Sequence, residues 1–319
     1  MVGFPQELML YRYRFVLRTK SCLSFAPSIG VSLRGAFGKW FKKVCCQDLD
    51  ASCLKCSDRE KCPYAQIFES SPPFGAERLS KNQNLPRPFV FKPPLREKEE
   101  YKAGEEFSFD LVLFGKAGDY LPYFILAFKE LAKEGIGVGR GKFELVGVWA
   151  VGRKGLEVRG RIFPEQDRNI SEKIPSQTFI YEAGFFSTSR IKVKFLTPTY
   201  LVFNKRRVAK PEFHHLFKRA RDRINALSTF YAGKPLEMDF AGAGRRSEKV
   251  KLVSARLTWE EHTRFSTKSG IRHPIGGVKG EVVYEGDFKE FLPLLLVGEE
   301  IHIGKHASFG NGWIEIEPM

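Results

Sequence analysis

The histidines are the first candidates for chemistry, and all six lie at or beyond position 214. Two of them, His302 and His306, flank Lys305 in the segment LLLVGEEIHIGKHASFGNGWIEI, residues 294–316. An imidazole can exchange a proton near neutral pH, and a fixed ammonium group can stabilise developing negative charge. We therefore treat His302 and His306 as acid–base candidates and Lys305 as a charge stabiliser. The simpler alternatives are a packing or capping role for either histidine, and a phosphate-binding or loop-clamping role for the lysine.

Thiols form a second candidate site, because five of the six cysteines lie within residues 45–62. Cys53, Cys56 and Cys62, with Cys45 or Cys46 upstream, supply four thiolates. Thiolates suit tetrahedral Zn²⁺ or an iron–sulfur cluster, and in a reducing compartment they favour metal binding over disulfides. The irregular spacing does not select the metal. We expect a structural clip for a small insertion, residues 45–75, and no cofactor for catalysis.

Two glycine-rich loops each follow a predicted helix and precede a predicted strand. They are GIGVGRG at residues 135–141 and the loop at residues 304–312. A dinucleotide-binding fingerprint needs the reverse order, strand then helix, so that interpretation is excluded. Glycines permit tight turns with positive φ, and they also let backbone N–H groups approach phosphates. Arg140 in one loop and Lys305 in the other favour contact with a phosphate backbone.

Basic residues exceed acidic residues, 52 against 37, and the formal net charge is +15. Such an excess indicates a polyanionic partner, with nucleic acid preferred over anionic lipid. The segment HHLFKRARDR, residues 214–223, concentrates cations on one helix and favours a phosphate-tracking surface over a merely solvated face. The predicted nucleic-acid-binding residues are Arg34, Lys39, Arg140, Lys218, Arg219, Arg221, Arg223, Arg245, Arg246, Gly310 and Gly312.

The elements that must position these residues repeat one plan. Hydrophobic periodicity and capping residues predict the order strand, helix, strand, strand, helix, strand in the first half. The expected elements are strands at 10–18, 87–92, 105–114 and 142–149, helices capped by Ser32 and Asp119, an added hairpin at 152–163 and a polar connector at 164–177.

The same order is expected in the second half. The expected elements are strands at 191–195, 249–259 and 277–284, a helix that begins at Pro211, a loop containing Gly244, Arg245 and Arg246, a helix capped by Asp287, and a closing strand. This duplication predicts an α+β fold of two tandem ferredoxin-like (RRM-like, βαββαβ) domains. We place them at residues 1–185, with the cysteine-rich insertion at 45–75, and at residues 186–319.

Several classes of protein are excluded. The first residues lack a secretory signal, and the longest apolar run near the end, residues 291–297, is too short to span a bilayer. We therefore expect a cytoplasmic protein without a membrane partner. No nucleophile elbow, P-loop or His-Glu-x-x-His motif is present. No carboxylate cluster suited to two-metal phosphodiester chemistry stands out either.

Two groups of motifs together resemble a known family. The first group is Leu33-Arg34-Gly35-Ala36-Phe37-Gly38, Cys53, Cys56, Cys62-Pro63-Tyr64 and Ile67-Phe68-Glu69. The second is Pro293-Leu294-Leu295, Gly298, His302-Ile303-Gly304-Lys305 and Phe309-Gly310-Asn311-Gly312. The chain resembles the CRISPR-associated repeat-RNA endoribonucleases of the RAMP superfamily, in the branch with a cysteine-rich insertion. The resemblance covers most of the chain and is weakest between residues 143 and 211.

The resemblance implies tandem ferredoxin-like domains that bind RNA in a basic, glycine-lined seam. It also implies metal-independent cleavage of CRISPR repeat RNA, in which a 2′-hydroxyl attacks the adjacent phosphate and leaves a 2′,3′-cyclic phosphate and a 5′-hydroxyl. The implied partners are repeat RNA or crRNA and, in addition, subunits of a CRISPR effector complex; the protein itself would be a monomer or homodimer. Many members use a histidine from the first domain, which this chain lacks. A non-catalytic RAMP subunit that binds crRNA is therefore the alternative.

Overall fold

The computed structural model describes residues 2–26, 28–69, 85–95, 98, 100–164, 173–266 and 270–319. The end of the predicted insertion, from residue 70, and most of the predicted connector at 164–177 lie outside these ranges. The chain divides into two compact units. One contains residues 10–174 and 230–232, and the other contains residues 1–9, 175–229 and 233–319. The domain boundary expected at residue 185 stays a prediction.

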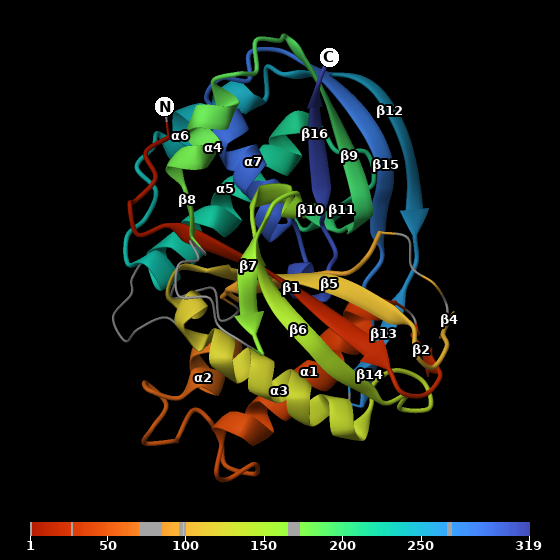
Figure 1. Cartoon of the computed structure of the whole chain (residues 1–319). Coiled ribbons are helices and arrows are strands. Elements are labelled where there is room, and N and C mark those ends of the chain that lie inside the picture. The colour runs from red at the N-terminus through yellow and green to blue at the C-terminus, as the bar shows by residue number, and fades with distance from the viewer. Residues whose placement is uncertain are drawn as a thin grey trace. The chain divides into compact units, whose positions relative to one another are not determined.

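The unit formed by residues 10–174 is built on an antiparallel sheet (Figure 1). Its strands follow the order β3-β5-β1-β6-β7, and β8 pairs with β1 beside this path. The bounds are β1 Met9–Thr19, β3 Phe89–Lys92, β5 Glu106–Phe114, β6 Phe143–Val151, β7 Val158–Phe163 and β8 Lys173–Pro175. With helices α1, Ile29–Cys45, and α3, Leu121–Glu134, this gives β-α-β-β-α-β connectivity around a central β1–β5 pair. The predicted ferredoxin-like order is confirmed, and β7 is the added hairpin strand.

The core of this unit is a cluster of phenylalanines between the sheet and its helices. Phe37 of α1 lies at its centre, with six neighbouring rings whose centroids are 4.8–6.1 Å away. Those rings belong to Phe41, Phe68, Phe89, Phe91, Phe124 and Phe128. Offset and edge-to-face ring pairs add to the free energy gained from burial. The cluster ties α1, α3 and the short helix α2, Pro63–Phe68, to β3.

A buried ion cluster lies between β1 and β5. Asp110 is 5% exposed, and its carboxylate accepts hydrogen bonds from Arg12 Nε and Arg14 Nε, each at 2.8 Å. Arg14 Nη2 also donates to the carbonyl oxygen of Gly155, at 3.2 Å. Lys92, opposite Asp110 on β3, is buried as well. The Asp110 carboxylate therefore pairs with two guanidinium groups, one of them buried.

The second unit repeats the topology (Figure 1). Its antiparallel sheet has the order β12-β15-β9-β16, with helices α5 and α7 in the two crossover positions. The bounds are β9 Arg190–Thr199, α5 Phe213–Leu227, β12 Lys251–Glu260, β15 Gly277–Glu285, α7 Leu292–Ile301 and β16 Ile314–Pro318. Two copies of one α+β plan confirm the tandem ferredoxin-like fold.

Short elements complete the description. They are β2 Leu23–Ser24, β4 Glu100–Tyr101, η1 Gly115–Tyr120, η2 Arg153–Gly155, α4 Gln177–Ala183, β10 Leu201–Phe203, β11 Arg206–Val208, η3 Ser228–Ala232, α6 Phe240–Ser247, β13 Thr263–Ser266, β14 Ile271–Pro274 and η4 Ala307–Phe309. None of the helices in the described ranges is long and apolar enough to cross a membrane.

The predicted helix starts are wrong in detail. Helix α1 is capped by Ser28, whose Oγ accepts from the backbone N–H of Val31, and not by Ser32. Asp119 lies in η1, because Pro122 occupies the first turn of α3 and fixes its start. A second proline, Pro293, likewise starts α7 five residues beyond Asp287. The Asp287 carboxylate instead accepts from the backbone N–H of Lys289, at 3.1 Å.

The predicted loop around residues 244–246 is also wrong, since these residues lie in α6. The side chain of Asp239 caps this helix by accepting from the backbone N–H of Gly242, at 2.8 Å. The helix predicted from Pro211 begins at Phe213, after Glu212. The glycines favoured a loop in the sequence. In the structure Gly242 and Gly244 are buried in α6, and their small size lets this helix pack closely against its neighbours.

Candidate functional site

The loop that follows α7 owes its glycines to its own geometry. Gly310 and Gly312 have φ of +91° and +79°, and a Cβ on Gly312 would lie 2.1 Å from the carbonyl oxygen of Ile303. The N–H of Gly310 donates to Ala307, and that of Gly312 donates to Pro198. These two N–H groups are therefore already used within the chain. RNA binding by Gly310 and Gly312 stays a prediction, and it would have to involve groups other than these paired N–H groups.

The same geometry predicts the effect of adding one methyl group. We expect Gly312→Ala to destabilise the protein well beyond the roughly 1–2 kcal/mol of left-handed backbone strain, because the carbonyl of Ile303 must also move. Gly233→Ala is the matched control, since Gly233 has φ +80° with no atom within 4 Å of the added Cβ. Urea denaturation of both variants measures the difference. Equal free energies of unfolding would contradict the steric explanation.

His302, the other histidine predicted as an acid–base group, is buried away from the surface of the loop, and its catalytic role stays a prediction. Its side chain is 0% exposed, and Nδ1 lies 3.0 Å from the carbonyl oxygen of Asn311. The imidazole stacks on Trp313, with ring centroids 5.6 Å apart. A fully buried ring cannot reach a ribose hydroxyl. The sequence pattern could not reveal this, because a histidine at the end of a helix can face either the core or solvent.

Lys305 and His306 are the two predicted catalytic residues that the loop presents together. The backbone N–H of Lys305 donates to the carbonyl oxygen of Tyr200 at 3.0 Å, which fixes the loop against the end of β9. Lys305 is exposed, and its Nζ lies 5.4 Å from the centroid of the Tyr200 ring. The half-buried His306 ring meets the same tyrosine edge-on, at 6.3 Å. A cation and an imidazole thus share one aromatic neighbour.

Further aromatic and cationic groups surround this pair, and the sequence analysis missed them. The Trp259 ring lies 5.8 Å from that of Tyr200 and has the Arg207 guanidinium 5.2 Å from its centroid. On the other side, Arg264 lies 5.0 Å from the centroid of Phe309, which also neighbours His306. The segment TWEEHTRF, residues 258–265, contains both aromatic and basic residues and could have indicated this. We call Tyr200, Trp259, Lys305, His306 and Phe309 the loop cluster.

Electrostatics keep the imidazole of His306 neutral. Burial lowers the pKa of His306 to about 4, and the nearby charges of Arg264, Lys305 and His273 act in the same direction. A neutral imidazole can accept a proton at physiological pH. The loop cluster therefore combines a proton acceptor, an exposed cation and aromatic faces on which bases can stack.

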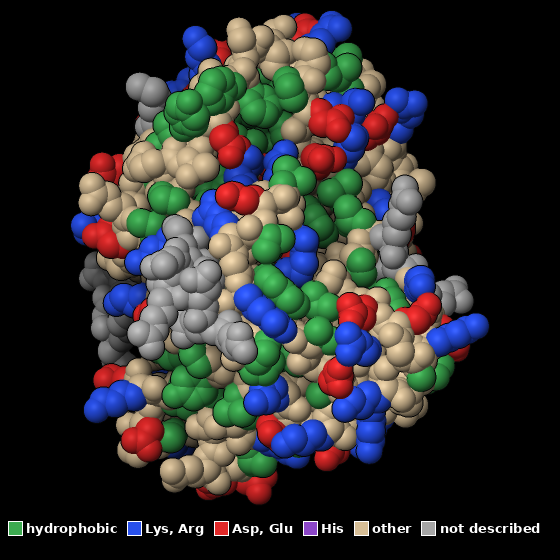
Figure 2. Space-filling model, viewed as in Figure 1, with side chains coloured by type: hydrophobic (Ala, Val, Ile, Leu, Met, Phe, Trp, Pro, Cys, Tyr) green, Lys and Arg blue, Asp and Glu red, His purple; other side chains and the backbone are tan. Residues whose placement is uncertain are grey.

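Most of the predicted phosphate ligands on α5 and α6 have partners within the chain. Lys218 pairs with Glu248 at 2.6 Å, and Arg246 pairs with Glu290 at 2.6 Å. The other pairings are Arg219 and Arg221 with Asp222, and Arg223 with the carbonyl oxygen of Ile301. Arg245 is exposed. Figure 2 likewise shows basic and acidic side chains intermixed on one face of the molecule. RNA binding by these six residues stays a prediction.

The three predicted ligands in the other unit lie in different environments. The Arg34 guanidinium lies 4.5 Å from the centroid of Phe68, so it packs against an aromatic ring. Lys39 is exposed on α1. Arg140 is exposed in the glycine loop with φ +53°, beside Gly139. RNA binding by these three residues stays a prediction.

The cysteines of the insertion are free thiols. Burial, followed by the neighbouring Cys62, raises the pKa of Cys45 to about 12. Burial also raises the pKa of Cys53, although the charge of Lys42 acts in the opposite direction. The neighbouring Cys46 and Cys62 raise it further. Within the described residues, no three His, Cys, Asp or Glu side chains are arranged to hold a metal ion. Metal binding by Cys45, Cys53, Cys56 and Cys62 therefore stays a prediction.

Comparison with known proteins matches the two halves to family models. Residues 8–175 match a model described as an N-terminal domain, and residues 193–314 match the model of the CRISPR-associated endoribonuclease Cas6. An uncharacterized protein of Archaeoglobus fulgidus is 28% identical over 298 residues, which are 91% of this chain and 92% of that protein.

Solved structures share the fold over almost the whole chain. A partial Cas6-RT-Cas1–Cas2 complex matches with a TM-score of 0.59 at 12% identity and covers 99% of this chain, which spans only 47% of that longer protein. Thermus thermophilus Cas6 matches with a TM-score of 0.54 at 14% identity, over 97% of this chain and 99% of that one. A Cas6 product complex gives a TM-score of 0.57 at 15% identity, with the same coverage. The carboxy-terminal part of the chain thus matches the Cas6 family model, and the solved Cas6 structures share the fold of nearly the whole chain.

Proposed function

We propose that this protein is an endoribonuclease that binds and cleaves CRISPR repeat RNA to generate crRNA. The observation that carries the proposal is the loop cluster, in which neutral His306 and exposed Lys305 adjoin Tyr200. The match of residues 193–314 to the Cas6 family model supports the substrate class. The matched structures include Cas6 with product and Cas6 with a substrate mimic. Assembly with subunits of a CRISPR effector complex stays a prediction.

The residues of the cluster suit cleavage by internal transesterification. His306 accepts the proton of a 2′-hydroxyl, whose oxygen attacks the adjacent phosphorus. Lys305 stabilises the charge on the phosphorane and donates a proton to the departing 5′ oxygen. The P–O5′ bond breaks, leaving a 2′,3′-cyclic phosphate and a 5′-hydroxyl. The rings of Tyr200, Trp259 and Phe309 offer stacking surfaces for the flanking bases.

Incubation of the purified protein with its own repeat RNA in excess EDTA tests the proposal. We expect one cleavage within the repeat and a 3′ product whose 5′ end can be phosphorylated directly by a kinase. RNA that stays intact in EDTA but is cleaved with Mg²⁺ would contradict the metal-independent mechanism. Intact RNA under both conditions would contradict catalysis altogether.

The alternative is a non-catalytic RAMP subunit that binds crRNA. Two observations favour it: no histidine occurs before His214, and His302 is buried. Tight binding of repeat RNA without cleavage would support this alternative. The same incubation, followed by native gel electrophoresis, therefore separates the two functions.

The pKa of His306 predicts an unusual pH profile. Because its pKa is lowered to about 4, we expect kcat/KM to stay level from about pH 8 to pH 6 and to fall only as His306 becomes protonated below about pH 5. A histidine with the ordinary pKa near 6.5 would lose activity already between pH 7 and pH 6. As the pH falls, His306 is protonated in the unfolded chain before it is protonated in the folded chain. The free energy of unfolding therefore also falls as the pH drops from about 6.5 to 4. Measuring kcat/KM under conditions where the protein stays folded checks the profile.

The cysteine cluster predicts a structural metal. We expect about one Zn²⁺ or one iron–sulfur cluster per chain, and we expect Cys53→Ser to lose it and to lower the melting temperature more than the activity per folded molecule. Cys22→Ser is the matched control, because Cys22 is exposed and lies outside residues 45–62. Elemental analysis and differential scanning calorimetry provide the two readouts. An unchanged melting temperature in the Cys53 variant would remove the argument for a structural clip.

A further inference from the structure

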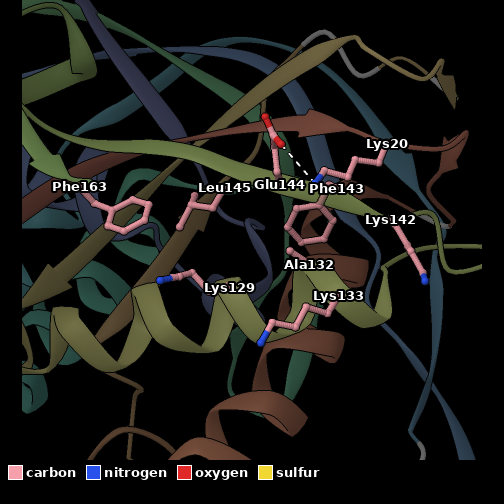
Figure 3. Close-up of a pocket in the computed structure, with 9 residues that line it drawn as sticks. All are labelled: Lys20, Lys129, Ala132, Lys133, Lys142, Phe143, Glu144, Leu145 and Phe163. Atoms are coloured by element: carbon pink, nitrogen blue, oxygen red, sulfur yellow. Dashed lines mark ion pairs between the residues drawn. The ribbon is translucent and has the colours of Figure 1, made fainter. Parts of the chain in front are cut away.

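A basic pocket lies within the unit formed by residues 10–174, apart from the loop cluster. Figure 3 shows its lining, with side chains contributed by the end of β1, helix α3, strand β6 and the last residue of β7. Its volume is about 490 Å³, within the range of small-ligand pockets. The residues used below are Lys20, Lys129, Lys133, Lys142, Phe143 and Phe163.

The pocket carries an excess of positive charge. Four lysines line it, against the single carboxylate of Glu144. Glu144 is already shared, since it pairs with Lys20 at 3.3 Å and with Arg18 at 3.0 Å. Lys133 pairs with Glu130 at 2.7 Å, but the lysine side chain is 68% exposed. Exposed ion pairs of this kind are weak and can exchange for a phosphate.

One wall of the pocket is aromatic. Phe143 is a lining residue that is almost fully buried, and Phe163 is half-buried at the end of β7. The Nζ of Lys129 lies 5.3 Å from the centroid of the Phe163 ring, on which it forms a cation–π contact. In Figure 3, Phe163 and Phe143 line the strand side, and Lys129 and Lys133 extend from α3. Aromatic faces among mobile cations are typical of surfaces that bind single-stranded nucleic acid.

The backbone around the pocket is well fixed. The N–H groups of Lys20 and Ser21 both donate to the carbonyl oxygen of Lys142, at 2.7 and 3.3 Å. The N–H of Lys142 donates in return to Ser21 Oγ, at 2.9 Å. Lys142 also directly follows the glycine loop at 135–141, whose Arg140 is exposed. Hydrogen bonds between the backbone segments of Lys20 and Lys142 therefore hold two of the lining lysines on one frame.

We propose that this pocket is a separate RNA subsite that holds one nucleotide of single-stranded RNA. The base lies against Phe163, next to Lys129, and the adjoining phosphates contact Lys20, Lys133 and Lys142. This inference rests on the proposed function for its ligand, but it concerns affinity and not the chemical step. A free mononucleotide is a poorer candidate, because four lysines from three separate segments offer more positive charge than a single phosphate group requires.

A binding experiment with matched charge changes tests the subsite. Fluorescence anisotropy would follow binding of the repeat RNA with 2′-fluoro substitution throughout, which prevents attack by a 2′-hydroxyl. The variant Lys20→Gln/Lys133→Gln/Lys142→Gln is compared with Lys55→Gln/Lys61→Gln/Lys102→Gln. The control removes the same charge from exposed lysines of the same unit.

We expect the pocket variant to bind about tenfold more weakly and to lower the slope of log Kd against log salt by about 2, whereas the control keeps the slope. Phe163→Ala should weaken binding about tenfold, and Phe163→Trp should retain it. Equal binding by pocket and control variants would overturn the subsite while leaving the proposed function intact. If the wild-type protein bound no repeat RNA, the proposed function itself would fail. Competition by AMP alone would point to a mononucleotide site and contradict the RNA subsite.

Discussion

Replacement of Lys305 by alanine together with His306 by asparagine is expected to slow single-turnover cleavage of repeat RNA by about 10³-fold or more. Loss of a general base costs roughly 10²–10⁴-fold, and loss of a group that stabilises transition-state charge costs roughly 10²–10³-fold. Asparagine is chosen because His306 has φ +64°, which asparagine tolerates and most residues do not. The affinity for RNA should fall much less than the rate, since one cation is lost from a large binding surface.

His262→Ala is the matched control for this experiment. His262 is a partly exposed histidine of the same unit, and its Nε2 lies 3.3 Å from the Glu260 carboxylate, outside the loop cluster. Cleavage should be measured with enzyme in excess over RNA, so that product release does not limit the rate. An unchanged rate in the Lys305/His306 variant, with the fold intact, would move the active site elsewhere. A comparable loss in the His262 variant would indicate a general effect on the domain.

Asp110→Asn is expected to cause the largest loss of stability, about 3–5 kcal/mol, as is usual when one partner of a buried ion cluster is removed. The Asp110 carboxylate compensates the charges of Arg12, which is 3% exposed, and Arg14. The asparagine side chain has nearly the same shape but no charge. It leaves two guanidinium groups beside each other and near Lys92, without the carboxylate that compensated them.

Glu106→Gln provides the control on the same two strands. Arg18 and Glu106 are paired across β1 and β5, as Arg14 and Asp110 are, but both side chains are almost half exposed. Water and salt screen such a pair, so the variant should unfold at nearly the wild-type urea concentration. Similar midpoints for the Asp110 and Glu106 variants would show that the buried cluster does not stabilise this unit.

The fold could be predicted from the sequence because the apolar spacing is strong and local. Alternation along residues 10–18 and helical spacing around Phe37 and Phe124 lead to the observed β1, α1 and α3. Helix starts were predicted less well, since Ser28 and Ser32 are chemically equal as caps and only tertiary packing distinguishes them. Pro122 and Pro293 carried the missing information, because a proline in the first turn fixes where a helix begins.

The site could be predicted only in part. The sequence placed Lys305 and His306 in one predicted loop, and in the structure both side chains lie next to Tyr200. It could not show that His302 is buried, because burial depends on Trp313 and Asn311 on the returning strand. Nor could it show that Tyr200 and Trp259 join the cluster, since these residues are separated from Lys305 by long stretches of chain. The paired cations Lys218 of α5 and Arg246 of α6 could not be predicted either, because their partners Glu248 and Glu290 are distant in sequence.

A high-resolution structure of the protein with its repeat RNA, carrying a 2′-deoxy substitution at the cleavage position, tests the central claim most directly. We predict that the scissile phosphate lies within hydrogen-bonding distance of Lys305 Nζ, and that His306 faces the carbon that normally bears the 2′-hydroxyl. A scissile phosphate bound elsewhere, with Lys305 and His306 contacting only other parts of the RNA, would contradict it.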